Sequence, residues 1–235
     1  MNNVLIITPI KDSIETAMKA VSIVCKYKAD FQYLVYNDLS TPENRAILEK
    51  EQSQGFELIN IEEQVTTPSP NYRFTLQDAR KRAVAQNAHL LIVESDVFIK
   101  ENTISSLLEK ANSLNNCGMI ASITTDETGD INFPYLHIDR TESGVVETNH
   151  RVSFCCTLLT LPLLMKLELD LLSEKKDWFD VQISKDSRKN GFKNFILTNS
   201  QVIHLPHSSR PWKKLKYQNP VKYYFRKFFY GKDRI

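Results

Sequence analysis

Glycine is scarce in this chain, which has only six glycines among 235 residues. None of them follows the first apolar segment, where a Rossmann dinucleotide site or a P-loop places glycines so that the backbone can approach phosphate groups. The sequence therefore argues against both kinds of nucleotide site.

Long apolar runs are also missing. The longest candidate, at 157–165, is interrupted by Thr160 and Pro162 and falls short of the roughly 18 residues that a membrane-spanning helix needs. The chain opens on uncharged polar residues and then the apolar stretch 4–7, which is typical of a first strand and not of a signal peptide. We therefore expect a cytoplasmic protein.

The cysteines do not form a recognisable metal-binding pattern. Cys155 and Cys156 are adjacent and so poorly placed to form an ordinary disulfide, and neither Cys25 nor Cys117 has a partner at metal-site spacing. We expect four reduced, buried thiols, as in other cytoplasmic proteins.

The net charge of +2 conceals two parts of opposite charge. Residues 210–235 hold nine Lys or Arg against one acid, Asp233, so this tail carries +8 and the first 209 residues carry −6. The tail interleaves its cations with aromatic residues, a composition that nucleic-acid-binding proteins also use, but no nucleic-acid motif accompanies it. We expect a basic amphipathic helix that lies on an anionic membrane surface; the alternative is that the aromatic residues pack on the domain.

Short β-branched apolar segments alternate with helical periodicity over the first 125 residues, which predicts a mainly parallel α/β sheet covered on both faces. Asp12–Glu15 has the pattern of a capping box, and Thr41 and Pro42 mark a second helix start. The strands we expect in this half are 4–8, 31–36, 57–61, 89–95 and 119–124, and the later helices are 75–87 and 103–114.

The pattern is less regular after residue 125. Residues 126–149 are polar and indicate a hairpin or a flexible excursion. Gly191 is a suitable C-cap for a helix over 178–190. The other elements we expect are a strand at 153–161, a helix at 162–171 and short strands at 195–198 and 201–204. Without a linker or a repeat, we expect one domain over 1–209 followed by the tail.

Acidic residues follow two of the predicted strands. Asp38 comes after the second strand, and Glu94 and Asp96 come directly after the apolar residues 90–93. Ligands of open α/β sheets bind beyond the carboxyl ends of strands, and two carboxylates two residues apart point to one side of extended backbone. Glu94 and Asp96 are thus candidates for holding a divalent cation; the alternative is that they are ordinary solvated acids.

At this point the order of motifs resembles that of family 2 glycosyltransferases with the GT-A fold. The similarity rests on five segments in the expected order. They are the apolar residues 6–7 followed by Thr8 and Pro9, the segment 36–40 around Asp38, the segment 93–96 with its two acids, the expected helix at 179–184, and the segment 202–204 that ends at His204. It extends over about 4–209. It implies a GT-A sheet flanked by helices, with a nucleotide-sugar-binding half at 1–125 and an acceptor half with a small antiparallel region at 126–209.

The resemblance also implies roles for individual residues. Asp38 would bind the nucleotide base, Thr8, Pro9 and Ser95 would line the nucleotide site, and Arg73, before the third helix, is a further candidate for the diphosphate. The residues implied to hold Mn²⁺ or Mg²⁺ are Glu94, Asp96 and His204. Asp180 would be the general base, with Asp177 as its competitor; a carboxylate in the first turn of a helix also interacts favourably with the helix dipole.

The activity implied is inverting transfer of a sugar from a nucleoside-diphosphate sugar, UDP-sugars being favoured, to a hydroxyl of a glycan or lipid-linked acceptor. Cell-surface polysaccharide synthesis at the inner face of the membrane would suit this activity and the basic tail. Two alternatives stay open. A non-catalytic nucleotide- or glycan-binding relative is one, since Phe179 and Gln182 replace acids of the family's helix. A sugar nucleotidyltransferase is the other, although its glycine-rich basic signature is missing.

Overall fold

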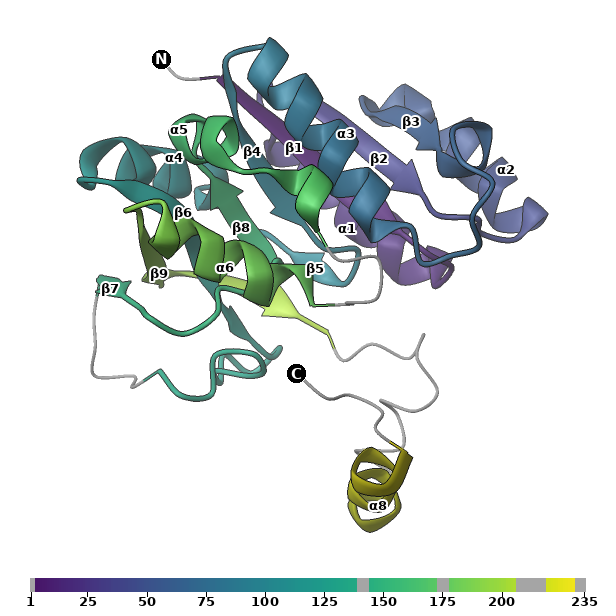
Figure 1. Ribbon diagram of the computed structural model, residues 1–235. Coiled ribbons are helices and arrows are strands. Elements are labelled where there is room, and N and C mark those ends of the chain that lie inside the picture. Colours follow the sequence, from purple (N-terminus) through teal and green to yellow (C-terminus); the bar gives the residue numbers. More distant parts are fainter. Residues whose placement is uncertain (1–2, 139–143, 173–177, 206–218, 231–235) are drawn as a thin grey trace.

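The fold is given by a computed structural model that describes residues 3–138, 144–172, 178–205 and 219–230. A curled mixed sheet forms its centre, and helices cover both faces of that sheet (Figure 1). The predicted α/β class, with a mainly parallel sheet, is confirmed.

The sheet of the described residues has the strand order β3-β2-β1-β4-β8-β6-β9-β5, and β7 pairs with β9 outside this order. Strands β3, β2, β1 and β4 are mutually parallel, and β9 is parallel to β6. Strand β8 runs antiparallel to both of its neighbours, β4 and β6, and β5 and β7 run antiparallel to β9. The bounds are β1 (Asn3–Ile10), β2 (Gln32–Asn37), β3 (Glu57–Asn60), β4 (Ala88–Val93), β5 (Val97–Phe98), β6 (Cys117–Thr125), β7 (Val145–Glu147), β8 (Cys156–Leu159) and β9 (Lys193–His204).

Two groups of helices cover the sheet. Apolar side chains of α1, α2 and α4 belong to one core cluster, and those of α3, α5 and α6 belong to the cluster on the opposite face (Figure 1). The helices are α1 (Ile14–Tyr27), α2 (Pro42–Lys50), α3 (Tyr72–Ala85), α4 (Thr103–Ser113), α5 (Leu161–Lys166), α6 (Phe179–Lys189) and α8 (Pro220–Tyr230), with 3-10 turns at Glu51–Gln54, Ile61–Glu63 and Leu169–Leu171.

Strand β1 illustrates why the central strands are apolar throughout. Leu5 and Ile7 lie in the cluster with α3, whereas Val4 and Ile6 lie in the cluster with α1. Successive side chains of a strand point to opposite faces of the sheet, so a strand covered on both faces needs apolar residues at every position.

The two predicted helix starts have different outcomes. At α2, the Thr41 side chain accepts a hydrogen bond from the Asn44 backbone N–H and Pro42 occupies the first turn, as predicted. The predicted capping box at α1 is wrong, because Ser13 has a left-handed backbone with φ of 49° and makes no side-chain cap bond. The Asp12 carboxylate instead accepts a hydrogen bond from the Thr41 backbone N–H, 3.3 Å away, and so serves the start of α2.

Several predicted boundaries shift in ways that matter for the site. Helix α3 begins at Tyr72 and not at 75, which places Arg73 in its first turn and not in the loop before it. The two short strands predicted at 195–198 and 201–204 are one strand, β9, whose register with β6 is irregular between Leu197 and Gln201. The predicted strand at 153–161 shortens to β8, and the predicted helix at 162–171 divides into α5 and a 3-10 turn.

The second half contains the expected antiparallel region. Strand β7 pairs with β9, and Thr125 forms an isolated antiparallel bridge with Ile131. Helix α6 ends as predicted at Gly191, whose φ is +81°, and the next N–H, of Phe192, donates to the carbonyl of Ser187.

All four cysteines are free, as expected, but Cys25 is half-buried and not buried. In the tail, α8 forms within the segment where an amphipathic helix is predicted, while 210–218 and 231–235 lie outside the described residues. Among the helices that the structure describes, each is too short or too polar to cross a membrane.

Candidate active site

The sheet topology brings the candidate residues to one edge. Strands β1, β2, β4, β6 and β9 all end at the same edge because they run in the same direction, and β8, which runs the opposite way, begins there. Asp38 follows β2, Glu94 follows β4, and His204 is the last residue of β9. This carboxyl edge is where open α/β sheets bind ligands.

Asp38 is held firmly at the end of β2. Its carboxylate accepts hydrogen bonds from the Ser69 hydroxyl at 2.7 Å, the Asn71 backbone N–H at 2.9 Å and the Asn71 side-chain amide at 2.8 Å. A carboxylate has about four acceptor positions, so these bonds leave capacity for one more donor. Asp38 therefore joins β2 to the segment before α3 and retains a position for a ligand.

The residues predicted to line the nucleotide site lie at this edge too, but they differ in accessibility. Thr8 is fully buried, and its hydroxyl accepts a hydrogen bond from the Tyr33 hydroxyl at 2.8 Å. A contact between Thr8 and a ligand would therefore use the backbone. Pro9, the next residue of β1, is half-buried, and Ser95 is buried between the two acids that follow β4.

Asp96 lies in a turn, so the prediction that Glu94 and Asp96 share one extended segment is wrong. Ser95 and Asp96 form a turn in which the Val97 N–H donates to the Glu94 carbonyl at 3.1 Å. The turn leads into β5, where Val97 pairs with His204. The short β5 strand thereby brings the acids after β4 close to the end of β9. The alternation of residues along a strand, on which the prediction rested, carries no information about this pairing.

The His204 side chain contacts residues from three other segments at this edge. Its Nδ1 lies 2.8 Å from the Phe133 carbonyl, to which Nδ1–H donates, so that Nε2 faces the acids. Nε2 lies 3.4 Å from an Asp96 carboxylate oxygen and 4.0 Å from the Cys155 sulfur. Burial disfavours the charged imidazole, but Cys155 and Asp96 favour it more strongly and raise the pKa of His204 to about 12.

The donor atoms at this edge suit a divalent cation. Glu94, Cys155 and His204 each offer one ligand atom, and these atoms all lie within 4.8 Å of one another. The Asp96 carboxylate adjoins the same imidazole and is only 1% exposed. Metal-binding histidines commonly donate their other ring N–H to a carbonyl, as His204 does to Phe133.

Sequence reasoning missed Cys155. Cysteine spacing carries no signal here, because the three possible ligands come from segments that follow β4, precede β8 and end β9. The pairing of Val93 with Cys156, which sets Cys155 at the carboxyl edge, depends on β8 entering the sheet antiparallel to β4.

Asp180, the predicted base, lies in the first turn of α6 and is paired with a cation. Its carboxylate lies 3.5 Å from the Arg151 guanidinium, and the two side chains are 13% and 21% exposed. The Arg151 guanidinium lies 5.2 Å from the ring centres of both Phe133 and Trp178, so aromatic rings hold it in place. The competing candidate, Asp177, lies outside the described residues.

Tyr72 connects the two halves of the site. Burial, followed by the nearby carboxylates of Glu94 and Asp180, raises the pKa of the Tyr72 hydroxyl well above its usual value. The Tyr72 ring also stacks on Phe179, which precedes Asp180. The acids after β4 and the start of α6 are therefore within electrostatic range of one side chain.

Arg73 makes a different contact from the predicted one. Its guanidinium donates a hydrogen bond of 2.8 Å to the carbonyl of Asp170 and so joins α3 to the 3-10 turn Leu169–Leu171. A contact between Arg73 and a diphosphate stays a prediction.

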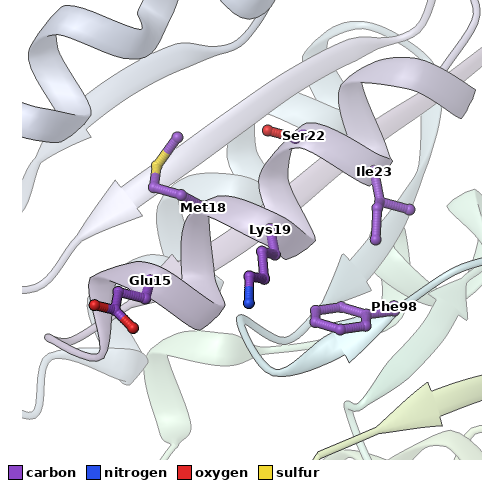
Figure 2. Close-up of a pocket in the computed structure, with 6 residues that line it drawn as sticks. All are labelled: Glu15, Met18, Lys19, Ser22, Ile23 and Phe98. Atoms are coloured by element: carbon purple, nitrogen blue, oxygen red, sulfur yellow. The ribbon is translucent and has the colours of Figure 1, made fainter. Parts of the chain in front are cut away.

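A separate open hollow of about 420 Å³ lies along α1, opposite β5 (Figure 2). It is lined by Glu15, Met18, Lys19, Ser22, Ile23 and Phe98 and shares no residue with the carboxyl-edge cluster. We therefore place the candidate active site at the cluster and not in this hollow.

The chain matches no protein-family model and no curated protein. Solved structures do match it: GalNAc-T7 with UDP, GalNAc and Mn²⁺ has a TM-score of 0.65 at 10% identity, over 89% of this chain and 45% of that one. PcManGT, a mannosyltransferase from Pyrobaculum calidifontis in complex with GDP-Man and Mn²⁺, scores 0.63 at 12% identity, over 96% and 64%. TarS of S. aureus in complex with UDP-GlcNAc scores 0.62 at 15% identity, over 88% and 60%.

The chain has the GT-A fold. The fold predicted from the order of the sequence motifs is thus confirmed. Each of these matches covers less than two thirds of the solved chain.

Proposed function

We propose that this GT-A chain transfers a sugar from a nucleoside-diphosphate sugar, a UDP-sugar in the first place, to a hydroxyl group of an acceptor. The observation that carries the proposal is the convergence of Glu94, Asp96 and His204 at the carboxyl edge of the sheet. The nucleotides and Mn²⁺ in the solved GalNAc-T7 and PcManGT structures support it.

A divalent cation, Mn²⁺ or Mg²⁺ in the first instance, is part of the proposal. Glu94, Asp96 and His204 would hold it. The His204–Phe133 hydrogen bond orients Nε2 toward the acids, so this ligand is already positioned. When bound, a divalent cation stabilises the negative charge that develops on a departing diphosphate.

The nucleotide is proposed to lie over the ends of β1 and β2. Asp38 would accept a hydrogen bond from the base; the bonds from Ser69 and Asn71, which hold its carboxylate in place, support this role. Thr8 and Pro9 would contribute backbone atoms, and Ser95 lies between the two acids. Arg73, in the first turn of α3, would contact the diphosphate in place of the Asp170 carbonyl.

Asp180 is proposed as the general base. It takes the proton of the acceptor hydroxyl while that oxygen attacks the anomeric carbon and the bond to the diphosphate breaks. One displacement of this kind inverts the configuration at the anomeric carbon. Arg151, held between two aromatic rings, is proposed to position the Asp180 carboxylate.

The test is a screen of UDP- and GDP-sugars for release of the nucleoside diphosphate, with and without Mn²⁺. We expect one donor to be consumed, and Asp180→Asn to lower the rate by roughly 10²- to 10⁴-fold with an unchanged KM for the donor. Asp186→Asn is the matched control, because Asp186 lies on the same helix and pairs only loosely with Lys189, at 3.4 Å.

The outcomes separate the alternatives. Consumption of no donor with any cation would contradict transfer, and nucleotide binding without turnover would favour a non-catalytic relative. An Asp180→Asn rate near that of the wild type would mean that another group, such as Asp177, is the base.

We also propose that the tail 210–235 places the enzyme at an anionic, cytoplasmic membrane surface, where a glycan or lipid-linked acceptor of cell-surface polysaccharide synthesis is assembled. Support comes from α8, where Val221, Tyr224 and Phe225 are 81%, 56% and 57% exposed beside Lys222. The full chain should pellet with phosphatidylserine vesicles at low salt and much less with phosphatidylcholine vesicles. No pelleting with either would contradict membrane binding.

A further inference from the structure

One buried thiol lies against the proposed cation site and has no part in the function proposed above. Cys155 immediately precedes β8 and is 2% exposed. Its sulfur lies 4.0 Å from His204 Nε2, and the sulfur, an imidazole nitrogen and a Glu94 carboxylate oxygen all lie within 4.8 Å of one another.

We propose that Cys155 binds the cation as a thiolate, together with Glu94 and His204, and that this sulfur ligand tunes the site toward thiophilic cations such as Zn²⁺ and Co²⁺. The inference rests on the function proposed above only in that both use one cation site. On binding, the S–H bond of Cys155 and the Nε2–H bond of the protonated His204 break, both protons pass to solvent, and a sulfur–metal and a nitrogen–metal bond form.

The spacing of the donor atoms suits a single small ion. Zinc bonds of about 2.0–2.3 Å to nitrogen, oxygen and sulfur place tetrahedral ligand atoms roughly 3.3–3.8 Å apart. The Asp96 oxygen already lies 3.4 Å from His204 Nε2, and the Cys155 sulfur lies 4.0 Å from it. The ligand atoms of Glu94, Cys155 and His204, all within 4.8 Å of one another, are thus close to the spacing that one ion needs.

The backbone around Cys155 is fixed by the sheet. The Glu94 N–H donates to the Cys155 carbonyl at 2.9 Å, which joins two of the proposed ligands through one hydrogen bond. The hydroxyl of Ser153, two residues earlier in the chain, lies 3.3 Å from the Cys155 sulfur. These contacts hold the thiol at the site before any ion binds.

The neighbouring Cys156 shows what an ordinary buried thiol looks like here. Cys156 pairs with Val93 within the sheet, and its side chain contacts Ser122 and not His204. Both cysteines are buried, so burial alone does not distinguish them, whereas proximity to a carboxylate and an imidazole does. Cys156 is therefore the matched control for Cys155.

The first test is absorption spectroscopy of the full chain titrated with Co²⁺ alone. A thiolate ligand gives an intense near-ultraviolet sulfur-to-cobalt charge-transfer band, which nitrogen and oxygen ligands do not give. We expect this band in the wild type and in Cys156→Ala, and its loss in Cys155→Ser. We expect Co²⁺ affinity in Cys155→Ser to fall by at least the roughly 10- to 100-fold that loss of an outer-shell partner costs. Absence of the band in the wild type at saturating Co²⁺, or its persistence in Cys155→Ser, would overturn the proposal.

A second measurement needs no variant. X-ray absorption of the zinc-loaded wild type should contain one sulfur neighbour at about 2.3 Å. A shell of nitrogen and oxygen alone would overturn the proposal, even if Cys155→Ser failed to fold.

Cation preference supplies the third readout. Zn²⁺ binds most sites more tightly than Mn²⁺, so the Zn²⁺/Mn²⁺ affinity ratio must be compared between variants. We expect Cys155→Ser to lower this ratio at least tenfold and Cys156→Ala to leave it unchanged. A sulfur-to-cobalt band in a protein that binds neither UDP nor GDP would contradict the proposed function but not this inference. Cation-dependent nucleotide binding without that band would contradict this inference but not the proposed function.

Discussion

A single added methyl group at Gly118 should disturb the contact that positions α6. Gly118 lies in β6, and a Cβ built on it would overlap the Ser187 hydroxyl and lie 2.7 Å from Cβ of Phe192. Ser187 is fully buried on α6, where its hydroxyl donates to the Asn194 side chain at 2.7 Å. Gly118→Ala must therefore displace α6 or break this hydrogen bond.

The expected cost follows from two opposing effects. Overpacking of a closed contact costs about 1–3 kcal/mol, whereas replacing glycine restricts the unfolded chain and returns about 0.4–1 kcal/mol. The two ranges leave a net loss of about 0–2.6 kcal/mol. Because the added Cβ would overlap two neighbours, we expect about 1–2 kcal/mol, which for a chain of this size lowers Tm by roughly 2–8 °C.

Thermal unfolding followed by circular dichroism measures this loss. Adding Ser187→Ala should recover part of it, because the overlapping hydroxyl is then gone. Since α6 carries Asp180, the proposed sugar transfer should fall more than UDP binding does. A Gly118→Ala variant as stable as the wild type would refute the close contact between β6 and α6.

Three further predictions concern other parts of the chain. Asp38→Ala should lower the free energy of unfolding in urea by at least about 2 kcal/mol, since Ser69 and Asn71 lose their acceptor; an unchanged midpoint would contradict this. Burial lowers the pKa of His89, so on acidification the unfolded state takes up a proton that the folded state does not bind. The free energy of unfolding should therefore fall as the pH drops below about 6.5, by up to about 1.4 kcal/mol per pH unit. His89→Gln should lack that part of the pH dependence. Iodoacetamide should label half-buried Cys25 of the native chain before Cys117, because burial raises the pKa of Cys117 to about 12; mass spectrometry after a short exposure checks the order.

Local signals predicted most of the framework. Alternating strand and helix patterns identified the parallel strands, and the start of α2 followed from Thr41 and Pro42 because a cap acts within one turn. The same reasoning failed at Asp12, whose carboxylate is used by the Thr41 N–H, a group distant in sequence. Local patterns cannot reveal such a competing partner.

Only part of the candidate site could be predicted, because local patterns do not show which distant segments meet. Asp96 and His204 do lie together, as the order of the motifs implied, although their roles remain proposals. Cys155 and Arg151 were missed, because their positions depend on β8 entering antiparallel beside β4 and on the packing of α6. Contacts of this kind are set by tertiary structure, and a single sequence carries no signal for them.

Calorimetry of UDP and GDP binding tests the central claim most directly. The wild-type chain should bind one of these nucleotides in the presence of Mn²⁺, lose most of that affinity in EDTA, and lose it in Asp96→Asn. Glu109→Gln, at an exposed position on α4, should bind as the wild type does. Failure of the wild type to bind either nucleotide with any divalent cation would contradict the proposal that this GT-A chain uses a nucleotide sugar.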